Sequence, residues 1–383
     1  MDKQQHLEQL FSSNQEENIQ LAFTLLKGQD DLEMPAYIQG LLHFYTWLCS
    51  LKYMEQLPLI REDLDHDSAI VLCLLHLKEL ELEVRDSSII PSSIQYLSAL
   101  EELSIRQGPI QQLPAEIGCL RQLKALYIHD LLLEELPPTI GQLTQLQHLV
   151  VVSNKLTALP DNIGQLQQLE LLKIPRNQCT YLPESIGQLQ ALQVLHLGGN
   201  PLSQLPKSLG QLQQLVELNL SGTPLQEFPI SFTQPTALRR IYFGRNTIQL
   251  TVLPSEIGQL RHLKSLKINN NQLTELPQSI GQLAALQELN LWSNALQQLP
   301  ESIGQLAQLQ QLHVLHNQLT TLPSSLQQCT QLHTLAIAFN PLLQLPTWLL
   351  NLEALQLLQV EGRFRDSAVV LGLQARGVLV KLL

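Results

Sequence analysis

Histidine and cysteine are the residues of this sequence that could hold a metal or attack a substrate, and their spacing decides whether either chemistry is possible. Zinc ligands must converge within a few ångströms of one point. His129 and His148 lie four residues out of register in neighbouring leucine-rich stretches, about 13 Å along a strand. His196 and His313 lie on strands that are five repeats apart. We therefore expect these histidines, and His316, to be ordinary surface residues with no bound metal.

The cysteines show no pattern typical of a catalytic or redox site. They are scattered through the chain without a CxxC pair, and two of them, Cys179 and Cys329, replace leucines of a repeat. The absence of a terminal cysteine cluster favours a reducing compartment. There is no GxxxxGK[ST] phosphate-binding loop, and no acid–base or nucleophile pair recurs at outward strand positions. The sequence thus predicts no enzyme and no cofactor.

Side chains suited to binding gather between residues 240 and 339. Trp, Tyr and Arg dominate the energetics of protein interfaces, and an exposed Trp at an outward strand position makes no core contact that explains it. A surface without any binding role is the alternative interpretation. The candidate partner-binding residues are Arg240, Tyr242, Arg245, Lys267, Trp292, His313, Leu315, His316 and Phe339.

Charge is distributed unevenly in this acidic chain, whose net charge is -11. Residues 1–90 carry 16 acidic and 6 basic side chains, whereas residues 239–267 carry six basic side chains against Glu256 alone. This balance argues against duplex nucleic acid, which requires a broad basic surface. The basic segment instead favours a protein or peptide with an acidic or phosphorylated segment beside an apolar anchor. The acidic end around Glu79, Glu81 and Glu83 is the next candidate.

A sequence repeat predicts the elements that position these side chains. Its clearest mark is a proline that follows an apolar residue. Ten of the eleven intervals between these prolines are 23 residues. The aligned unit is LxLxxNxLxxLPxxIGQLxxL, as in residues 195–215. A 23-residue period that keeps seven apolar positions in register predicts a solenoid. The prolines are at positions 91, 114, 137, 160, 183, 206, 229, 254, 277, 300, 323 and 346.

Each unit predicts a short strand followed by a short helical segment. Leu195 and Leu197 alternate with His196, so the two leucines point inward from a strand. Pro206 cannot donate a ladder hydrogen bond and is suited to a first helical turn. Leucines at spacings of three behind it predict the inner stripe of a helical or 3₁₀ segment. The recurring Asn of the turn can satisfy backbone groups, and the Gly of IGQL serves either close packing or an unusual φ.

The unit resembles the 23-residue repeats of intracellular leucine-rich-repeat proteins, among them Ras-binding scaffolds, Scribble-type proteins, the ROCO family and bacterial relatives. The resemblance covers residues 54–365. It implies an α/β solenoid of horseshoe shape, with about thirteen parallel strands on the concave face, short helical or 3₁₀ segments on the convex face and an α-helical N-terminal cap. It also implies partner binding on the concave face.

The ends and one irregular unit complete the predicted organisation. Residues 1–53 form a helical cap, with one helix from the capping box at Ser13 and Glu16 to Gly28 and another from Pro35 to Ser50. Residues 54–76 are a degenerate first unit of the array 54–365, and residues 366–383 form a helix-plus-strand cap. The unit at 229–254 carries two extra residues around 249–252. They are either a neutral insertion in an exposed loop or a local kink that serves recognition.

The sequence therefore predicts a non-catalytic scaffold that binds a protein or peptide. The alternatives are a sensor for glycan or lipid, or a translocated effector that acts by binding. Glycan binding would favour more aromatic platforms than the four at Tyr127, Tyr242, Trp292 and Phe339, and lipid binding requires an apolar pocket. No stretch reaches the ~18 apolar residues of a membrane span, and the start has no signal-peptide pattern. We expect a cytoplasmic monomer.

Overall fold

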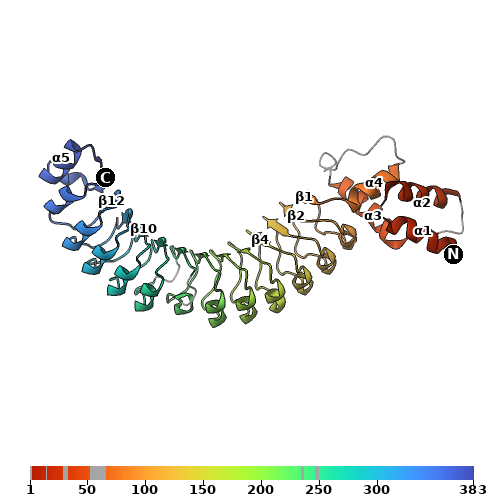
Figure 1. Ribbon diagram of the computed structural model, residues 1–383, viewed down its shortest axis with the longest axis horizontal. Helices are drawn as coiled ribbons and strands as arrows, with labels where there is room; N and C mark the ends of the chain where they lie inside the picture. The colour runs from red at the N-terminus through yellow and green to blue at the C-terminus, as the bar shows by residue number, and fades with distance from the viewer. Residues whose placement is uncertain (1, 14, 29–32, 52–65, 234–236, 246–249) are drawn as a thin grey trace. The chain divides into compact units, whose positions relative to one another are not determined.

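The computed structural model describes residues 2–13, 15–28, 33–51, 66–233, 237–245 and 250–383. The chain divides into two compact units, Met1–Leu172 and Lys173–Leu383. In each unit short parallel strands line one side and 3₁₀ helices line the other (Figure 1). The predicted repeat solenoid is therefore confirmed.

The strands follow one another in sequence order and pair in parallel. In the first unit Leu103 of β2 lies opposite Leu80 of β1 and Leu126 of β3, and in the second unit Leu289 lies between Leu266 and Leu312. The described residues form fourteen strands: thirteen strands of the repeats, and β14, where the C-terminal stretch for which the sequence predicts a strand pairs with β13. The strands are β1 (Glu79–Glu83), β2 (Glu102–Arg106), β3 (Ala125–His129), β4 (His148–Val152), β5 (Leu171–Lys173), β6 (Val194–His196), β7 (Glu217–Asn219), β8 (Arg240–Tyr242), β9 (Ser265–Lys267), β10 (Glu288–Asn290), β11 (Gln311–His313), β12 (Thr334–Ala336), β13 (Leu357–Val360) and β14 (Leu379–Leu382).

The core lies between the strands and the 3₁₀ helices. Leu195 and Leu197 have no exposed surface, and neither do Leu209, Leu212 and Leu215 behind them. Burying such a side chain stabilises the fold by about 1.5–3 kcal/mol. The 3₁₀ helices are η2 (Ser92–Tyr96), η3 (Ala115–Cys119), η4 (Pro138–Gln142), η5 (Asp161–Gln165), η6 (Glu184–Gln188), η7 (Lys207–Gln211), η8 (Ile230–Thr233), η9 (Ser255–Gln259), η10 (Gln278–Gln282), η11 (Glu301–Gln305), η12 (Ser324–Gln328), η13 (Thr347–Asn351) and η14 (Gly362–Phe364).

The turn asparagines satisfy the backbone of two units at once, as predicted. Asn317 donates through Nδ2 to the carbonyls of Leu291 (3.0 Å) and Val314 (3.1 Å), and its Oδ1 accepts from the amide of Leu296 (3.0 Å). The same pattern recurs at Asn340. Because these asparagines are buried, each removes polar groups that would otherwise lie unpaired beside the core.

The Gly of IGQL serves close packing. A Cβ at Gly304 would overlap the carbonyl oxygen of Ser325 in the next 3₁₀ helix, and Gly187 meets Ser208 in the same way. Neither glycine has a positive φ. The sequence allows two explanations for this glycine, close packing and an unusual φ. The structure supports close packing.

The N-terminal part contains four described helices: α1 (Lys3–Ser12), α2 (Glu16–Gly28), α3 (Ala36–Ser50) and α4 (His66–Leu75). Two of them, α2 and α3, match the predicted helices in position. The predicted degenerate unit is α-helical from 66 to 75, with Val71 and Leu74 buried on α4. The first part of this unit, residues 54–65, lies outside the described residues.

The C-terminal part ends in α5 (Ala368–Ala375) and β14. Ser367 is the N-cap of α5, and its Oγ accepts a hydrogen bond from the amide of Val370 at 3.2 Å. Gly377 has a φ of 83° and ends the helix in the left-handed conformation that favours glycine. Both features bound the helix of the helix-plus-strand cap that the sequence predicts. Of the extra residues predicted around 249–252 in the irregular unit, residue 249 lies outside the described residues, and residues 250–252 are described.

Candidate binding surface on the sheet

The candidate residues lie in four positions of consecutive repeats in the second unit. Arg240 and Tyr242 are on β8, Lys267 on β9 and His313 on β11. The register places Tyr242 opposite Lys267, then Asn290, then His313. The two-residue insertion does not shift this register, because it follows β8 and precedes β9.

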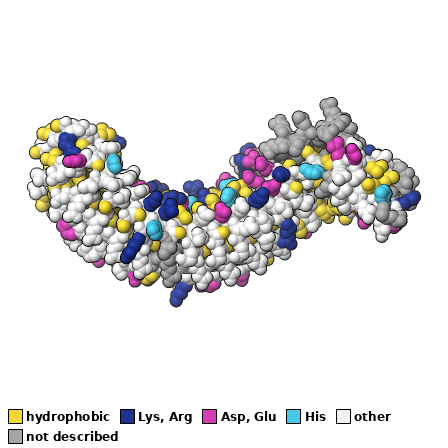
Figure 2. Space-filling view, viewed as in Figure 1, with side chains coloured by type: hydrophobic (Ala, Val, Ile, Leu, Met, Phe, Trp, Pro, Cys, Tyr) yellow, Lys and Arg dark blue, Asp and Glu magenta, His cyan; other side chains and the backbone are white. Residues whose placement is uncertain are grey.

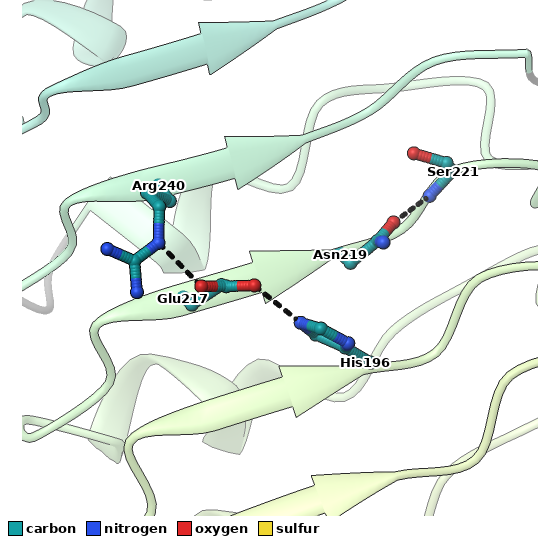
Figure 3. Close-up of polar contacts among 5 residues, drawn as sticks. All are labelled: His196, Glu217, Asn219, Ser221 and Arg240. Carbon is teal, nitrogen blue, oxygen red and sulfur yellow. Dashed lines mark hydrogen bonds and ion pairs between the residues drawn. The ribbon is translucent and has the colours of Figure 1, made fainter.

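Arg240 is held by a carboxylate from the preceding strand. Its Nε lies 2.5 Å from Oε2 of Glu217, whose Oε1 lies 2.8 Å from Nε2 of His196 (Figure 3). Asn219, beside them on β7, accepts a hydrogen bond from the amide of Ser221 at 2.9 Å. The guanidinium of Arg240 is therefore already half of an ion pair.

These contacts shift the pKa values of the two titratable partners. Burial raises the pKa of Glu217, but the hydrogen bonds from Arg240 and His196 outweigh it, and the net pKa is lowered. Burial lowers the pKa of His196 and outweighs the opposite influence of Glu217. The structure therefore favours a neutral imidazole beside a charged carboxylate.

Lys267 is also neutralised by a neighbouring strand. Its Nζ lies 2.9 Å from Oε1 of Glu288 on β10 and 5.7 Å from the ring centre of Tyr242. Ser265 donates to the other oxygen of Glu288 at 2.8 Å. The count of charges within residues 239–267 therefore omits the carboxylate partners of Arg240 and Lys267, which come from repeats outside that segment.

Trp292, His316 and Phe339 form a row of exposed rings after β10, β11 and β12. The rings of His316 and Phe339 stack with centres 4.2 Å apart and planes 13° apart. The ring of Trp292 lies 6.3 Å from that of His316. Trp292 is 36% exposed and Phe339 43%, while Leu315, beside them, is half-buried. The sequence prediction that these rings share a surface agrees with this geometry.

His316 and Phe339 adopt a backbone conformation that bulky residues rarely adopt. The residue after the strand has a φ between 53° and 74° in eleven repeats. We call these residues the left-handed column. This conformation costs an L-residue about 1–2 kcal/mol relative to a right-handed one. The column consists of Gln107, Asp130, Ser153, Arg176, Gly199, Gly222, Arg245, Asn270, Ser293, His316 and Phe339.

The first unit presents an acidic face that is partly neutralised within itself. Glu81 pairs with Arg106, and Glu83 lies 3.4 Å from Arg85. Figure 2 shows the acidic side chains over β1 and β2, and Lys and Arg side chains on the strand side of the second unit. Tyr127 lies between two shallow hollows of about 370 Å³ and 320 Å³. The larger is lined by Ser104, Arg106, Gln107, Tyr127, His129 and Asp130.

The two cysteines that replace leucines of the repeat occupy core positions. Burial raises the pKa of Cys179 to about 12 and that of Cys329 to about 11, so both thiols stay protonated at neutral pH. Ala125 of β3 pairs with His148, which places His129 four residues away along the strand, as the sequence predicts. The described part of the chain contains no cluster of residues that could hold a metal ion, and none of its helices could cross a membrane.

Glu217 and Glu288 are the surface residues that sequence reasoning missed. Each lies two positions before another outward residue of its strand, Asn219 or Asn290. Because strand side chains alternate at period 2, both glutamates share the outward face with these asparagines. Extending the alternation by one step towards the N-terminus of each strand would have found them.

Comparisons with known proteins agree with this architecture. Residues 51–156 and 161–241 match the model of a leucine-rich repeat region, and residues 261–319 and 284–342 match that of a leucine rich repeat. Comparison with curated proteins gives no match.

Solved structures share the fold. A leucine-rich-repeat protein of Leptospira interrogans is 31% identical, with a TM-score of 0.70, over 80% of this chain and 84% of that one. A plant peptide hormone receptor in complex with RGF2 is 30% identical, with a TM-score of 0.63, over 74% of this chain and 48% of that one. An internalin of Listeria monocytogenes, 19% identical over 85% of this chain and 97% of that one, has a TM-score of 0.61 and shows the fold alone. On the repeat, the strands and these matches, the chain belongs to the leucine-rich-repeat family.

Proposed function

We propose that this protein is a non-catalytic scaffold that binds a protein or peptide on the exposed face of its sheet, in the second unit. The observation that carries the proposal is the row of exposed rings at Trp292, His316 and Phe339. These rings are exposed, and two of them occupy a backbone conformation that disfavours large side chains. Leucine-rich repeats are widely protein-interaction scaffolds, and the related plant receptor was solved in complex with RGF2.

The nine candidate residues form one surface in this proposal, with a division of roles that follows from their contacts. Trp292, Leu315 and Phe339 supply the apolar anchor. Arg240, Tyr242, Lys267 and His313 form a structured polar rim, since the two cations already have carboxylate partners. Arg245 is exposed and has no ion pair with a carboxylate of the described residues. A partner with an acidic or phosphorylated segment beside an apolar side chain matches this arrangement.

Replacing Trp292 by Ala tests the proposal. A peptide library displayed on phage is selected on the full-length protein, and the affinities of selected peptides are measured for both proteins. We expect the substitution to cost about 2 kcal/mol, or about 30-fold in Kd, because truncated Trp residues are typical hot spots. The melting temperature should change little, since the side chain is outside the core.

Tyr181 provides the matched control, because it is an aromatic residue that is 56% exposed and lies outside the row of rings. Tyr181→Ala should leave the affinity unchanged. If the protein selected no peptide and captured no protein, but bound defined sugars on a glycan array, the glycan-sensor alternative would replace this proposal. The cytoplasmic location and the monomeric state stay predictions.

A further inference from the structure

The left-handed column continues the hydrogen-bond ladder of the sheet, so its members are regularly spaced. The amide of Arg176 donates to Gly198 at 2.8 Å, that of Gly222 to Gly244 at 2.8 Å, and that of Arg245 to Asn269 at 3.0 Å. The amide of His316 donates to Ala338 at 3.1 Å. Neighbouring members are therefore one strand spacing apart, about 4.8 Å.

Large side chains recur at every third position of this column in the second unit. Arg176, Arg245 and His316 are each separated by two small residues, and Phe339 stacks on His316. Two of the intervening residues, Gly199 and Gly222, leave the backbone uncovered between the arginines. Three spacings of about 4.8 Å place consecutive large side chains about 14 Å apart.

The two arginines differ from Arg240 and Lys267 on the same face. Arg176 and Arg245 are exposed, and neither pairs with a carboxylate among the described residues, whereas Arg240 and Lys267 do. Their left-handed backbone disfavours any long side chain, so the fold does not require arginine at either position. Glycine or asparagine adopts this backbone conformation more easily than arginine does. An arginine here that has no carboxylate partner is therefore available to bind a partner protein.

We infer that the left-handed column binds an extended segment of a partner protein with acidic residues at positions i and i+4 and an aromatic or large apolar residue at i+8. This inference rests on the proposed function and specifies its partner. In an extended chain, residues four apart point to the same side and lie about 13–14 Å apart, which matches the spacing of Arg176, Arg245 and His316. The segment crosses the strands, and the apolar residue contacts the rings of His316, Phe339 and Trp292.

Carboxylates fit this surface better than phosphates. Recognition of a phosphorylated residue usually relies on a cluster of arginines around one dianion. Here each arginine is a single cation about 14 Å from the next, which suits one aspartate or glutamate apiece. Electrostatic complementarity of this kind fixes the register of the partner and accelerates association.

The test uses the full chain and a dye-labelled dodecapeptide with Glu at positions 2 and 6, Trp at position 10, and Ser, Thr or Gly elsewhere. A second peptide has the glutamate moved from position 6 to 7, which turns it to the opposite side. Fluorescence anisotropy measures the Kd of each. We expect the shifted peptide to bind at least tenfold more weakly, and Arg176→Glu or Arg245→Glu to weaken the first peptide at least tenfold.

Lys264→Glu is the matched control, because it makes the same charge change on an exposed residue before β9, at the opposite end of the strand from the column. It should change the Kd less than twofold. The inference is overturned if Lys264→Glu and Arg245→Glu weaken binding equally, if both glutamate positions bind equally well, or if phosphoserine in place of the glutamates binds tenfold more tightly. It is overturned too if the first peptide does not bind. The scaffold proposal would survive each of these results as long as library peptides still depended on Trp292.

Discussion

At the scale of single residues, the sheet face of the second unit holds two kinds of charge. Arg240 and Lys267 are fixed by Glu217 and Glu288, so they order the surface more than they attract a partner. Exposed ion pairs of this kind contribute at most about 1 kcal/mol each. Replacing either cation should therefore affect binding less than replacing Arg245, which holds no such partner among the described residues.

The contact of His196 with Glu217 predicts a pH dependence of stability. Burial lowers the pKa of His196 in the folded state, so the unfolded chain takes up the proton first, and stability is lost as pH falls through about 6.5. The pKa of Glu217 is lowered too. Its contribution is present above the pKa of the unfolded chain and is lost only at more acidic pH, as pH falls through the folded pKa.

We expect the free energy of unfolding to fall between pH 7.0 and 5.5, and His196→Gln to make this fall smaller. Glutamine can still donate to Glu217 but does not titrate. Some pH dependence of the free energy of unfolding should remain in this variant, because burial also lowers the pKa of His129 and His313. Urea denaturation at both pH values measures the difference, and an equal fall in both proteins would contradict the assignment to His196.

At the scale of elements, each 3₁₀ helix is fixed by close contact with the next. Gly304 is buried in η11, and a Cβ there would overlap the backbone of Ser325 in η12. A backbone oxygen cannot rotate away as a side chain can, so the two repeats must separate to make room. This contact explains why the repeat carries Gly before Gln-Leu.

We expect Gly304→Ala to destabilise the protein by about 1–3 kcal/mol, the usual cost of overpacking. Gly362→Ala is the control, since a Cβ at Gly362 has no neighbour closer than the carbonyl oxygen of Leu383 at 3.9 Å. Chemical denaturation of both variants measures the free energy of unfolding. Equal stability of the two would show that the repeats can separate slightly at little cost.

Most elements of the repeats were predictable because each 23-residue period restates the same constraints. The strands, the proline before the 3₁₀ helix and the turn asparagines all follow from residue type and spacing. The helix α1 was missed, because its buried residues Leu7, Leu10 and Phe11 stand among polar ones in a short segment. The helix α4 was mistaken for a repeat, because its apolar residues also fit the repeat register.

At the scale of the whole molecule, the sequence aligned residues of the proposed binding surface but did not predict its charge balance. The fixed period aligned Tyr242 with Lys267 and His313, which the register confirms. Ion pairs between repeats join residues more than 20 positions apart, such as Arg240 and Glu217, so a count within one segment cannot find them. The left-handed column was also missed, since its φ values are not encoded by one residue type.

The N-terminal helices provide the last prediction, because the first repeat needs a neighbour on its open side. Phe44 of α3 is fully buried, Gly40 of α3 packs directly on the ring of Tyr96 in η2, and Nε1 of Trp47 lies 3.4 Å from Oγ of Ser87. Deleting residues 1–53 removes these contacts and exposes apolar side chains of η2. We expect the truncated protein to aggregate or to unfold in more than one step, as seen by size-exclusion chromatography and circular dichroism during urea denaturation. The point variant Gly40→Val, whose side chain would overlap Tyr96, should destabilise the intact chain in the same direction. A truncated protein that stays monomeric and unfolds in one transition at the wild-type midpoint would show that the helices are not a cap.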